Sequence, residues 1–166
     1  FAFAEFQFQF LKNNTRKFLN DVRSGYIDEI IRPMILKKAE DLVNQHKEAG
    51  DSLLIITATN TFITKPIGEI FGINELIGTD PEENLGEFTG KVKGTPSFKD
   101  GKVKRLFDWL NEKKLKLADF EKTFFYSDSH NDLALLEFVT NPVVVNGDKI
   151  LLEKAQEKNW PTLNLK

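Results

Sequence analysis

Short apolar runs alternate with amphipathic helical segments along most of this chain, and this alternation limits the folds that are open to it. Residues 52–56 form a short, continuous apolar run, which is typical of a strand covered on both faces, as in a parallel sheet. A helical pattern that carries Phe62, Ile63 and Ile67 follows this run. Strands that alternate with helices predict an α/β domain around a mostly parallel sheet. In such sheets, ligands bind where the carboxyl ends of the strands meet the following loops.

The same patterns predict the remaining elements. Phe6, Phe8 and Phe10 alternate as in a strand, whereas Phe3, Phe6 and Phe10 fit one face of a helix, so both structures stay open for the first ten residues. Between residues 15 and 31, apolar residues recur at helical spacing: Phe18, Leu19, Val22, Tyr26 and Ile30. We also expect helices at 33–50, 132–138 and 150–158, an amphipathic helix that starts at residue 101, strands at 76–78, 123–126 and 142–145, a strand near residue 163, and a hairpin at 86–94.

Charge and composition exclude several classes of protein. The 166 residues fit one domain and carry a formal net charge of −2, whereas nucleic acids and anionic membranes are bound by basic surfaces. No run of about 18 apolar residues is present, so we expect no membrane span. The chain has no cysteine, which fits a reducing cytoplasm and excludes a thiolate metal site. Oligomeric state stays open.

Three junctions between predicted elements carry polar residues suited to chemistry. The first is Thr57-Ala58-Thr59-Asn60, between a strand and a helix, where a hydroxyl beside free helix N–H groups can hold a phosphate. The alternative is that Thr59 or Asn60 only caps the helix. The second junction is Gly101-Lys102, where the ammonium group would face an anion; the alternative is one more solvated lysine after a turn.

The third junction is Ser127-Asp128-Ser129-His130-Asn131-Asp132, directly after the strand at 123–126. The strand ends at Asp128, and Asp132 follows four residues later in the first helical turn. That spacing can bring both carboxylates to one side of the loop, where oxygen ligands suit Mg²⁺. The alternative is an Asp/Ser/Asn turn that caps a helix. His130 is expected to be a solvent-facing loop residue, because it has no Cys or His partner at metal-ligand spacing.

Taken in order, these segments resemble the haloacid dehalogenase superfamily, in the branch of phosphoserine phosphatase and bacterial histidinol-phosphate phosphatases. The resemblance runs from about residue 30 to the end and is carried by Ile31-Arg32-Pro33-Met34, Leu54-Ile55-Ile56-Thr57-Ala58-Thr59-Asn60, Glu87-Phe88-Thr89-Gly90, Gly94-Thr95-Pro96, Gly101-Lys102-Val103 and Tyr126-Ser127-Asp128-Ser129-His130-Asn131-Asp132-Leu133. Ser127 stands where this branch more commonly has Gly. The last motif is specific, whereas the others gain weight from their order and spacing. In response-regulator receivers, by contrast, the acidic residues precede the Thr and the Lys.

The resemblance implies a role for each matching residue. Thr57 and the backbone near Ala58 would bind the phosphoryl oxygens, and Lys102 would neutralise the phosphate and an attacking carboxylate. Asp128 would ligate Mg²⁺, with Asp132 assisting directly or through water. Asn131 would contact the phosphate. The implied activity is Mg²⁺-dependent hydrolysis of a small phosphorylated metabolite, such as phosphoserine or histidinol phosphate, through a phospho-aspartate.

One departure from the family's pattern stands out. The family's nucleophile lies in an Asp-x-Asp motif on the first, central strand, and no Asp-x-Asp follows an apolar run in this chain. We therefore expect an upstream segment that holds this strand and the nucleophile, and we expect the 166 residues alone to be inactive. On this interpretation, residues 1–32 are the C-terminal part of a helical cap, and residues 33–166 are a Rossmann-like core without its first strand.

Two other interpretations stay open. The chain could be a non-catalytic remnant that binds a phosphorylated ligand or a partner protein. It could also be an α/β domain in which Asp128 and Asp132 are only turn residues.

Overall fold

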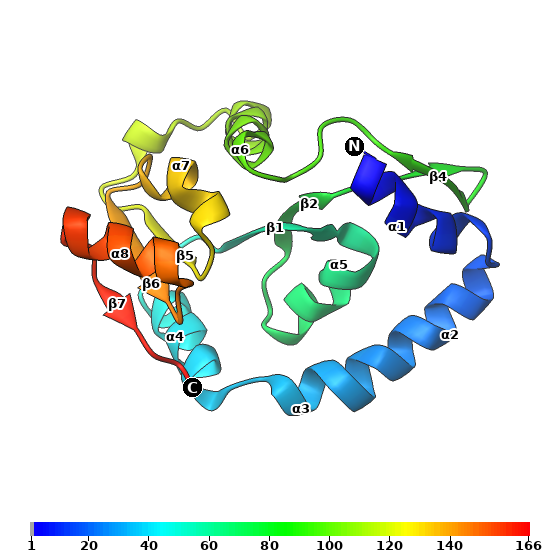
Figure 1. Cartoon of the computed structure of the whole chain (residues 1–166), viewed down its shortest axis with the longest axis horizontal. Helices are drawn as coiled ribbons and strands as arrows, with labels where there is room; N and C mark the ends of the chain where they lie inside the picture. The colour runs from blue at the N-terminus through cyan, green and yellow to red at the C-terminus, as the bar shows by residue number, and fades with distance from the viewer. Residues whose placement is uncertain (1) are drawn as a thin grey trace. The chain divides into compact units, whose positions relative to one another are not determined.

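The computed structural model describes residues 2–166, including the side chains of Phe6 and of residues 8–166. The chain forms two compact units, Phe1–Ser97 and Phe98–Lys166, which are coloured blue to green and green to red in Figure 1. The division expected from the sequence, into a cap remnant at 1–32 and a core at 33–166, stays a prediction, because compactness does not test which residues form a cap. None of the helices in the described residues has the length and apolar character that a membrane crossing needs.

Helices form most of the first unit. They are α1 (Ala2–Lys12), α2 (Arg16–Tyr26), the π-helical turn η1 (Ile27–Ile31), α3 (Arg32–Met34), α4 (Lys37–Glu48) and α5 (Thr61–Ile70). Residues 2–10 therefore belong to a helix and not to a strand. Thr15 begins α2 by accepting a hydrogen bond from the Phe18 backbone N–H at 3.3 Å. The core of this unit is a cluster of Phe8, Leu11, Leu19, Phe62 and Phe88.

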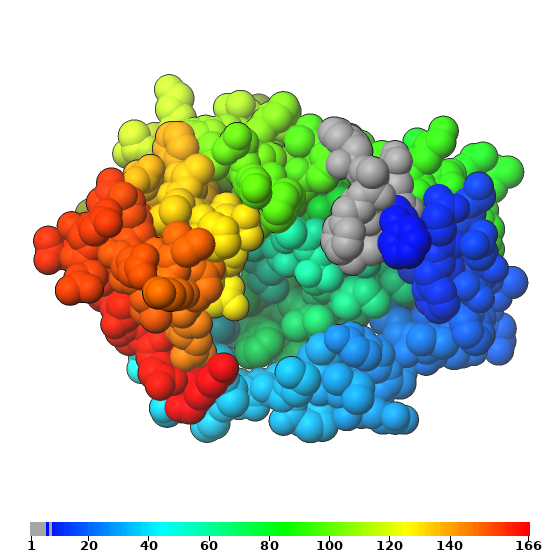
Figure 2. Space-filling model, viewed as in Figure 1, coloured from blue at the N-terminus to red at the C-terminus, as the bar shows by residue number. Residues whose placement is uncertain are grey.

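The apolar spacing in α1 and α2 predicts the helices but not the faces that they bury. In α1, Phe8 is buried, whereas Phe6 and Phe10 are exposed. In α2 and η1, only Leu19 and Ile27 are buried. The other residues of the predicted pattern are at least 42% exposed: Phe18, Val22, Tyr26 and Ile30. The helices α2 and α3 lie at the surface of the first unit (Figure 2).

Two small sheets complete the first unit. Strand β1 (Leu54–Asn60) pairs in parallel with β2 (Glu75–Thr79). An antiparallel hairpin joins β3 (Pro81–Asn84) to β4 (Glu87–Val92). The turn residues Leu85 and Gly86 both have positive φ, as a two-residue hairpin loop requires. The hairpin thus begins before the predicted 86–94 segment, because the first strand, Pro-Glu-Glu-Asn, has no apolar alternation to predict it.

The second unit is a three-stranded parallel sheet with helices. Its elements are α6 (Asp100–Glu112), the 3₁₀ turn η2 (Leu117–Asp119), β5 (Phe124–Ser127), the 3₁₀ turn η3 (His130–Asp132), α7 (Leu133–Leu136), β6 (Asn141–Val145), α8 (Lys149–Lys158) and β7 (Thr162–Leu163). The strands lie in the order β5-β6-β7. Leu136, Val144, Leu151 and Ala155 form a buried cluster between the sheet and its helices. The predicted α/β class with parallel sheets is confirmed.

Candidate active site

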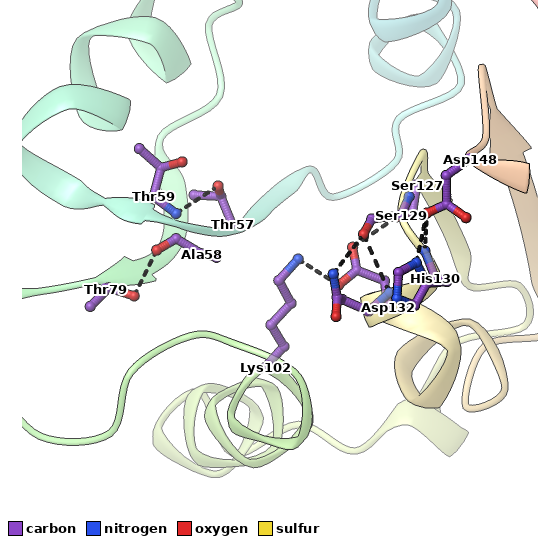
Figure 3. A network of polar contacts seen from close by, with 11 residues as sticks. Thr57, Ala58, Thr59, Thr79, Lys102, Ser127, Ser129, His130, Asp132 and Asp148 are labelled. Carbon is purple, nitrogen blue, oxygen red and sulfur yellow. Dashed lines mark hydrogen bonds and ion pairs between the residues drawn. The ribbon is translucent and has the colours of Figure 1, made fainter. Parts of the chain in front are cut away.

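The predicted site residues fall into two groups, one in each unit. Thr57 and Ala58 lie in the first unit, whereas Lys102, Asp128, Asn131 and Asp132 lie in the second. Figure 3 shows Thr57 and Ala58 of the first group and Lys102 and Asp132 of the second as sticks. The convergence of the two groups on one pocket stays a prediction.

In the first unit, Thr57 and Ala58 lie in an irregular part of strand β1. The sequence places them in a loop after the strand, but β1 continues to Asn60. Ile56 pairs with Ile77 and Asn60 pairs with Thr79, so four steps along β1 match two steps along β2. The extra residues bulge out of the ladder, as insertions in a strand do. The Thr57 Oγ1 atom accepts a hydrogen bond from the Thr59 backbone N–H at 3.2 Å within this bulge.

The capping alternative is resolved by Asn60. Its side chain accepts a hydrogen bond from the Ile63 backbone N–H at 3.0 Å and so caps α5. Neither Thr57 nor Thr59 is the cap residue, and Thr59 lies exposed in the bulge. The start of α5 is therefore explained without Thr57, whose hydroxyl accepts a hydrogen bond within the bulge.

Two residues that the sequence reasoning missed hold the bulge in place. The buried Thr79 hydroxyl donates to the Ala58 carbonyl oxygen at 2.8 Å and accepts from the Ser97 backbone N–H at 3.1 Å. A Cβ at Gly78 would lie 2.9 Å from the Thr59 carbonyl oxygen, so only glycine allows this close approach. A Gly-Thr pair at the end of a strand is the only signal in the sequence, and it does not identify the partners.

In the second unit, Lys102 and Asp132 form a buried ion pair. The Lys102 Nζ atom lies 2.6 Å from Asp132 Oδ1, and the side chains are only 10% and 7% exposed. The Ser127 hydroxyl donates to the other carboxylate oxygen, Oδ2, at 2.8 Å. Figure 3 shows the lysine reaching from α6 toward this carboxylate. The interpretation of Lys102 as a solvated lysine is therefore wrong, because its ammonium group is buried and paired.

Asp128 has a different environment, although it lies only four residues away. It is exposed and directly follows strand β5. Within residues 2–166 its carboxylate has no hydrogen-bond or ion-pair partner. A free carboxylate at the end of a parallel strand suits Mg²⁺, which commonly binds one or two protein carboxylates and keeps several waters. No group of three or more His, Asp or Glu side chains in the described residues is arranged around a metal position, so Asp128 would act with other ligands.

The segment between the two acids is held by local hydrogen bonds. The Ser129 hydroxyl accepts from the Asn131 backbone N–H at 3.3 Å and from the Asn131 side-chain amide at 3.2 Å. The backbone N–H of Ser129 donates to the Ser127 hydroxyl at 3.2 Å. The side chain of Asn131 is thus tied to the turn that starts the helix, and its predicted contact with a phosphate stays a prediction.

His130 and Asp148 form a contact that the sequence reasoning missed. The His130 Nδ1 atom lies 2.9 Å from Asp148 Oδ2, and the side chains are 43% and 36% exposed. His130 is exposed, as the sequence predicts, but its contact with Asp148 was not predicted. The two residues are 18 positions apart, and no local pattern links them.

Comparison with known proteins shows the family of this chain. The model of the haloacid dehalogenase-like hydrolases matches residues 2–137. The chain belongs to the haloacid dehalogenase-like hydrolase family. A histidinol-phosphatase of Neisseria meningitidis is 43% identical over 166 residues, which are 99% of this chain and 75% of that protein. This similarity supports a phosphatase.

Further proteins resemble this chain in sequence or in fold. A crystal structure of a Bordetella pertussis protein of unknown function is 42% identical, with a TM-score of 0.96 over 98% of this chain and 73% of that one. A phosphoserine phosphatase of Mycobacterium tuberculosis is 32% identical over 133 residues, 80% of this chain but only 42% of that protein. The chain thus spans three quarters of the Neisseria protein and less than half of the Mycobacterium protein. A probable phosphoserine phosphatase from Vibrio cholerae shares the fold, with a TM-score of 0.64 at 16% identity over 86% of this chain and 42% of that one.

Proposed function

We propose that this chain binds the phosphoryl group and Mg²⁺ in a phosphomonoester hydrolase that acts through a phospho-aspartate. The observation that carries the proposal is the contrast within one loop of the second unit. Asp128 is exposed and has no partner within residues 2–166, whereas Asp132 is buried and paired with Lys102. Such a loop offers one free anionic ligand beside a fixed ammonium group. Phosphoryl transfer requires this kind of charge stabilisation and positioning more than covalent chemistry by the protein.

Each residue has a role in the proposal. Asp128 ligates Mg²⁺, which would neutralise charge on the phosphoryl oxygens. Asp132 assists through a water molecule, because its buried carboxylate is already held by Lys102 and Ser127. Lys102 stabilises the negative charge of the phosphate. Phosphoryl oxygens are bound by the hydroxyl of Thr57, the backbone N–H groups near Ala58 and the side chain of Asn131. This last role requires that the two units converge on one pocket.

The proposal requires a carboxylate nucleophile from outside these 166 residues. No Asp-x-Asp follows an apolar run in the chain, and the residues around Asp128 are already assigned to the metal loop. We therefore expect the 166 residues alone to lack turnover. The second candidate is a non-catalytic protein that binds a phosphorylated ligand or a partner, which would need no nucleophile.

For the substrate, we propose a small phosphorylated metabolite, with histidinol phosphate as the first candidate. The relative with 43% identity is named histidinol-phosphatase, and another relative is named phosphoserine phosphatase. The net charge of −2 does not favour a nucleic acid substrate. The lack of cysteine fits a reducing compartment such as the cytoplasm.

The test uses the full-length product of the gene. Turnover of histidinol phosphate, phosphoserine and an aryl phosphate is measured against Mg²⁺ concentration for the wild type, for Asp128→Asn, and for Asp108→Asn as a control on the exposed face of α6. Loss of groups that merely support a metal ligand already costs about 10–100-fold in activity or metal affinity, so loss of the ligand charge should cost at least that much.

Three results are informative. Loss of turnover in Asp128→Asn, with normal turnover in the control, supports the metal role. Undiminished turnover in Asp128→Asn shows that the metal assignment is wrong. A wild-type protein that binds phosphate with Mg²⁺ but hydrolyses none of the three compounds supports the non-catalytic candidate.

A further inference from the structure

Asp148 contacts the Asp128–Asp132 segment at two places and caps a helix at the same time. It lies between β6 and α8, and its Oδ1 atom accepts a hydrogen bond from the Leu151 backbone N–H at 2.9 Å. Its Oδ2 atom accepts from the His130 backbone N–H at 2.8 Å and lies 2.9 Å from the His130 ring nitrogen Nδ1. Its own backbone N–H donates to the Asp128 carbonyl oxygen at 2.9 Å. Figure 3 shows Asp148 beside His130, with the contacts between these two residues dashed.

We infer that Asp148 is a positioning residue that fixes the backbone of the metal-binding loop, so that the Asp128 carboxylate points toward its ion. The inference rests on the proposed function, because it takes Asp128 as the Mg²⁺ ligand. Asp148 does not touch the proposed ion or the substrate. It acts through the peptide groups on both sides of Ser129.

The need for such a tether follows from the freedom of Asp128. Since the Asp128 carboxylate has no partner within residues 2–166, no contact of its own holds its oxygens, and the loop backbone determines where the side chain starts. A ligand displaced by about 1 Å can cost about 10²-fold in a reaction that depends on geometry. The Asp148 backbone N–H holds the Asp128 carbonyl oxygen, and the Asp148 carboxylate holds the His130 N–H. The second contact is the stronger one, because hydrogen bonds to an ionised carboxylate are about twice as strong as neutral ones.

The chemistry of the contact agrees with this role. The hydrogen bond from the His130 backbone N–H, together with those from the Leu151 N–H and the His130 ring, lowers the pKa of Asp148 to about 2. The carboxylate can only accept hydrogen bonds, so the ring must carry its proton on Nδ1. Carboxylates that orient groups near a metal ion in this way commonly tune metal affinity without binding the ion.

A purely structural role, as the cap of α8, makes a different prediction, and the two oxygens of Asp148 allow the roles to be separated. Serine is about as good a cap as aspartate, so Asp148→Ser keeps the hydrogen bond to Leu151 and removes the contact of Oδ2 with His130. Asp148→Ala removes both. Asp119→Ser is the matched control, because Asp119 caps a different turn through the Lys116 backbone N–H at 2.7 Å.

The experiment uses NMR on the full-length gene product. Hydrogen exchange is followed at the His130 and Leu151 amides, and Mg²⁺ is titrated against the Asp128 and Asn131 amide signals. In Asp148→Ser we expect faster exchange at His130, unchanged exchange at Leu151 and an Mg²⁺ affinity about 10–100-fold weaker. The control Asp119→Ser should keep the wild-type affinity.

The outcomes separate this inference from the proposed function. Unchanged exchange at His130 in Asp148→Ser would show that the tether does not exist. Faster exchange with unchanged Mg²⁺ affinity would show that the tether does not position the ligand. A wild type that binds no Mg²⁺ overturns both the inference and the metal assignment. Weakened Mg²⁺ binding in Asp148→Ser supports the inference even if the wild type hydrolyses no phosphate, which contradicts only the proposed catalysis.

Discussion

The ion pair between Lys102 and Asp132 should stabilise the fold far more than a surface pair with the same geometry. The chain contains its own comparison on helix α6. Lys104 Nζ lies 2.6 Å from Asp108 Oδ2, the same distance as in the buried pair, but these side chains are 60% and 51% exposed. The two pairs therefore differ mainly in burial.

The informative change is Asp132→Asn, which keeps the shape and removes the charge. The amide oxygen of asparagine can still accept from Lys102, and its NH₂ group can donate to the Ser127 hydroxyl oxygen. The loss is then that of a counter-charge for a buried ammonium group, which costs about 3–5 kcal/mol. The change Asp108→Asn removes an exposed i,i+4 partner and should cost about 0.3–0.5 kcal/mol. Against a total stability of about 5–15 kcal/mol, only the first change is severe.

Thermal and urea denaturation of the full-length protein measure the difference. For a protein of about 150–250 residues, 1 kcal/mol shifts Tm by about 2–4 °C, so we expect a fall of about 6–20 °C for Asp132→Asn and about 1–2 °C for Asp108→Asn. The double variant Lys102→Met, Asp132→Leu should regain most of the loss, because apolar groups of similar volume often replace a buried pair without cost. Equal losses for the two single variants would refute the reasoning. A double variant no more stable than Asp132→Asn would show that the loss does not come from an uncompensated charge.

Two further predictions concern the frame of the site. Asn60→Ala should cost about 1 kcal/mol in urea denaturation, because it removes the cap of α5, whereas Asn60→Asp should cost little; an unchanged midpoint for the alanine variant would contradict the capping role. Leu136→Ala should cost about 2–5 kcal/mol, because Leu136 is fully buried beside Val144 and Leu151. Leu85, which is 98% exposed, is the control, and Leu85→Ala should stay within about 0.5 kcal/mol of wild type.

The strand and helix order could be predicted from the sequence because each signal is local. An apolar run that ends at Tyr126 places Asp128 just beyond a strand, and β5 does end at Ser127. The amphipathic pattern after Gly101 predicts α6 and places Lys102 in its first turn. These predictions need only neighbouring residues, since periodicity and turn chemistry act over one or two turns of the chain.

The buried faces of α1 and α2 could not be predicted, because apolar residues lie on more than one face of each helix. Phe8 and Leu19 are buried, whereas Phe10 and Val22, which fit the predicted pattern equally well, are exposed. The π-helical turn at Ile27–Ile31 adds to the difficulty, since i→i+5 hydrogen bonding changes the phase of every later side chain. Spacing shows that a helix has an apolar face, but only tertiary packing decides which face is covered.

The partners of the site residues could not be predicted from the sequence either. Asp148 caps α8, which is a local role that Asp commonly has at the start of a helix. Its contact with His130 spans 18 residues, and the contact of Lys102 with Asp132 spans 30. Such contacts depend on how the strands are ordered, which hydrophobic patterns do not specify.

The different environments of the two acids decide how charge is balanced in the proposed site. From spacing alone, Asp128 and Asp132 are equivalent candidates for a metal ligand. In the structure, the negative charge of Asp132 is already matched by Lys102. The negative charge of Asp128 is not matched, so this part of the site carries a net negative charge. A phosphate dianion would meet net repulsion there, since like charges at close range disfavour binding. Under the proposed function the missing positive charge must come from Mg²⁺, so the exposed Asp128 attracts the ion and the paired Lys102 orients the phosphate.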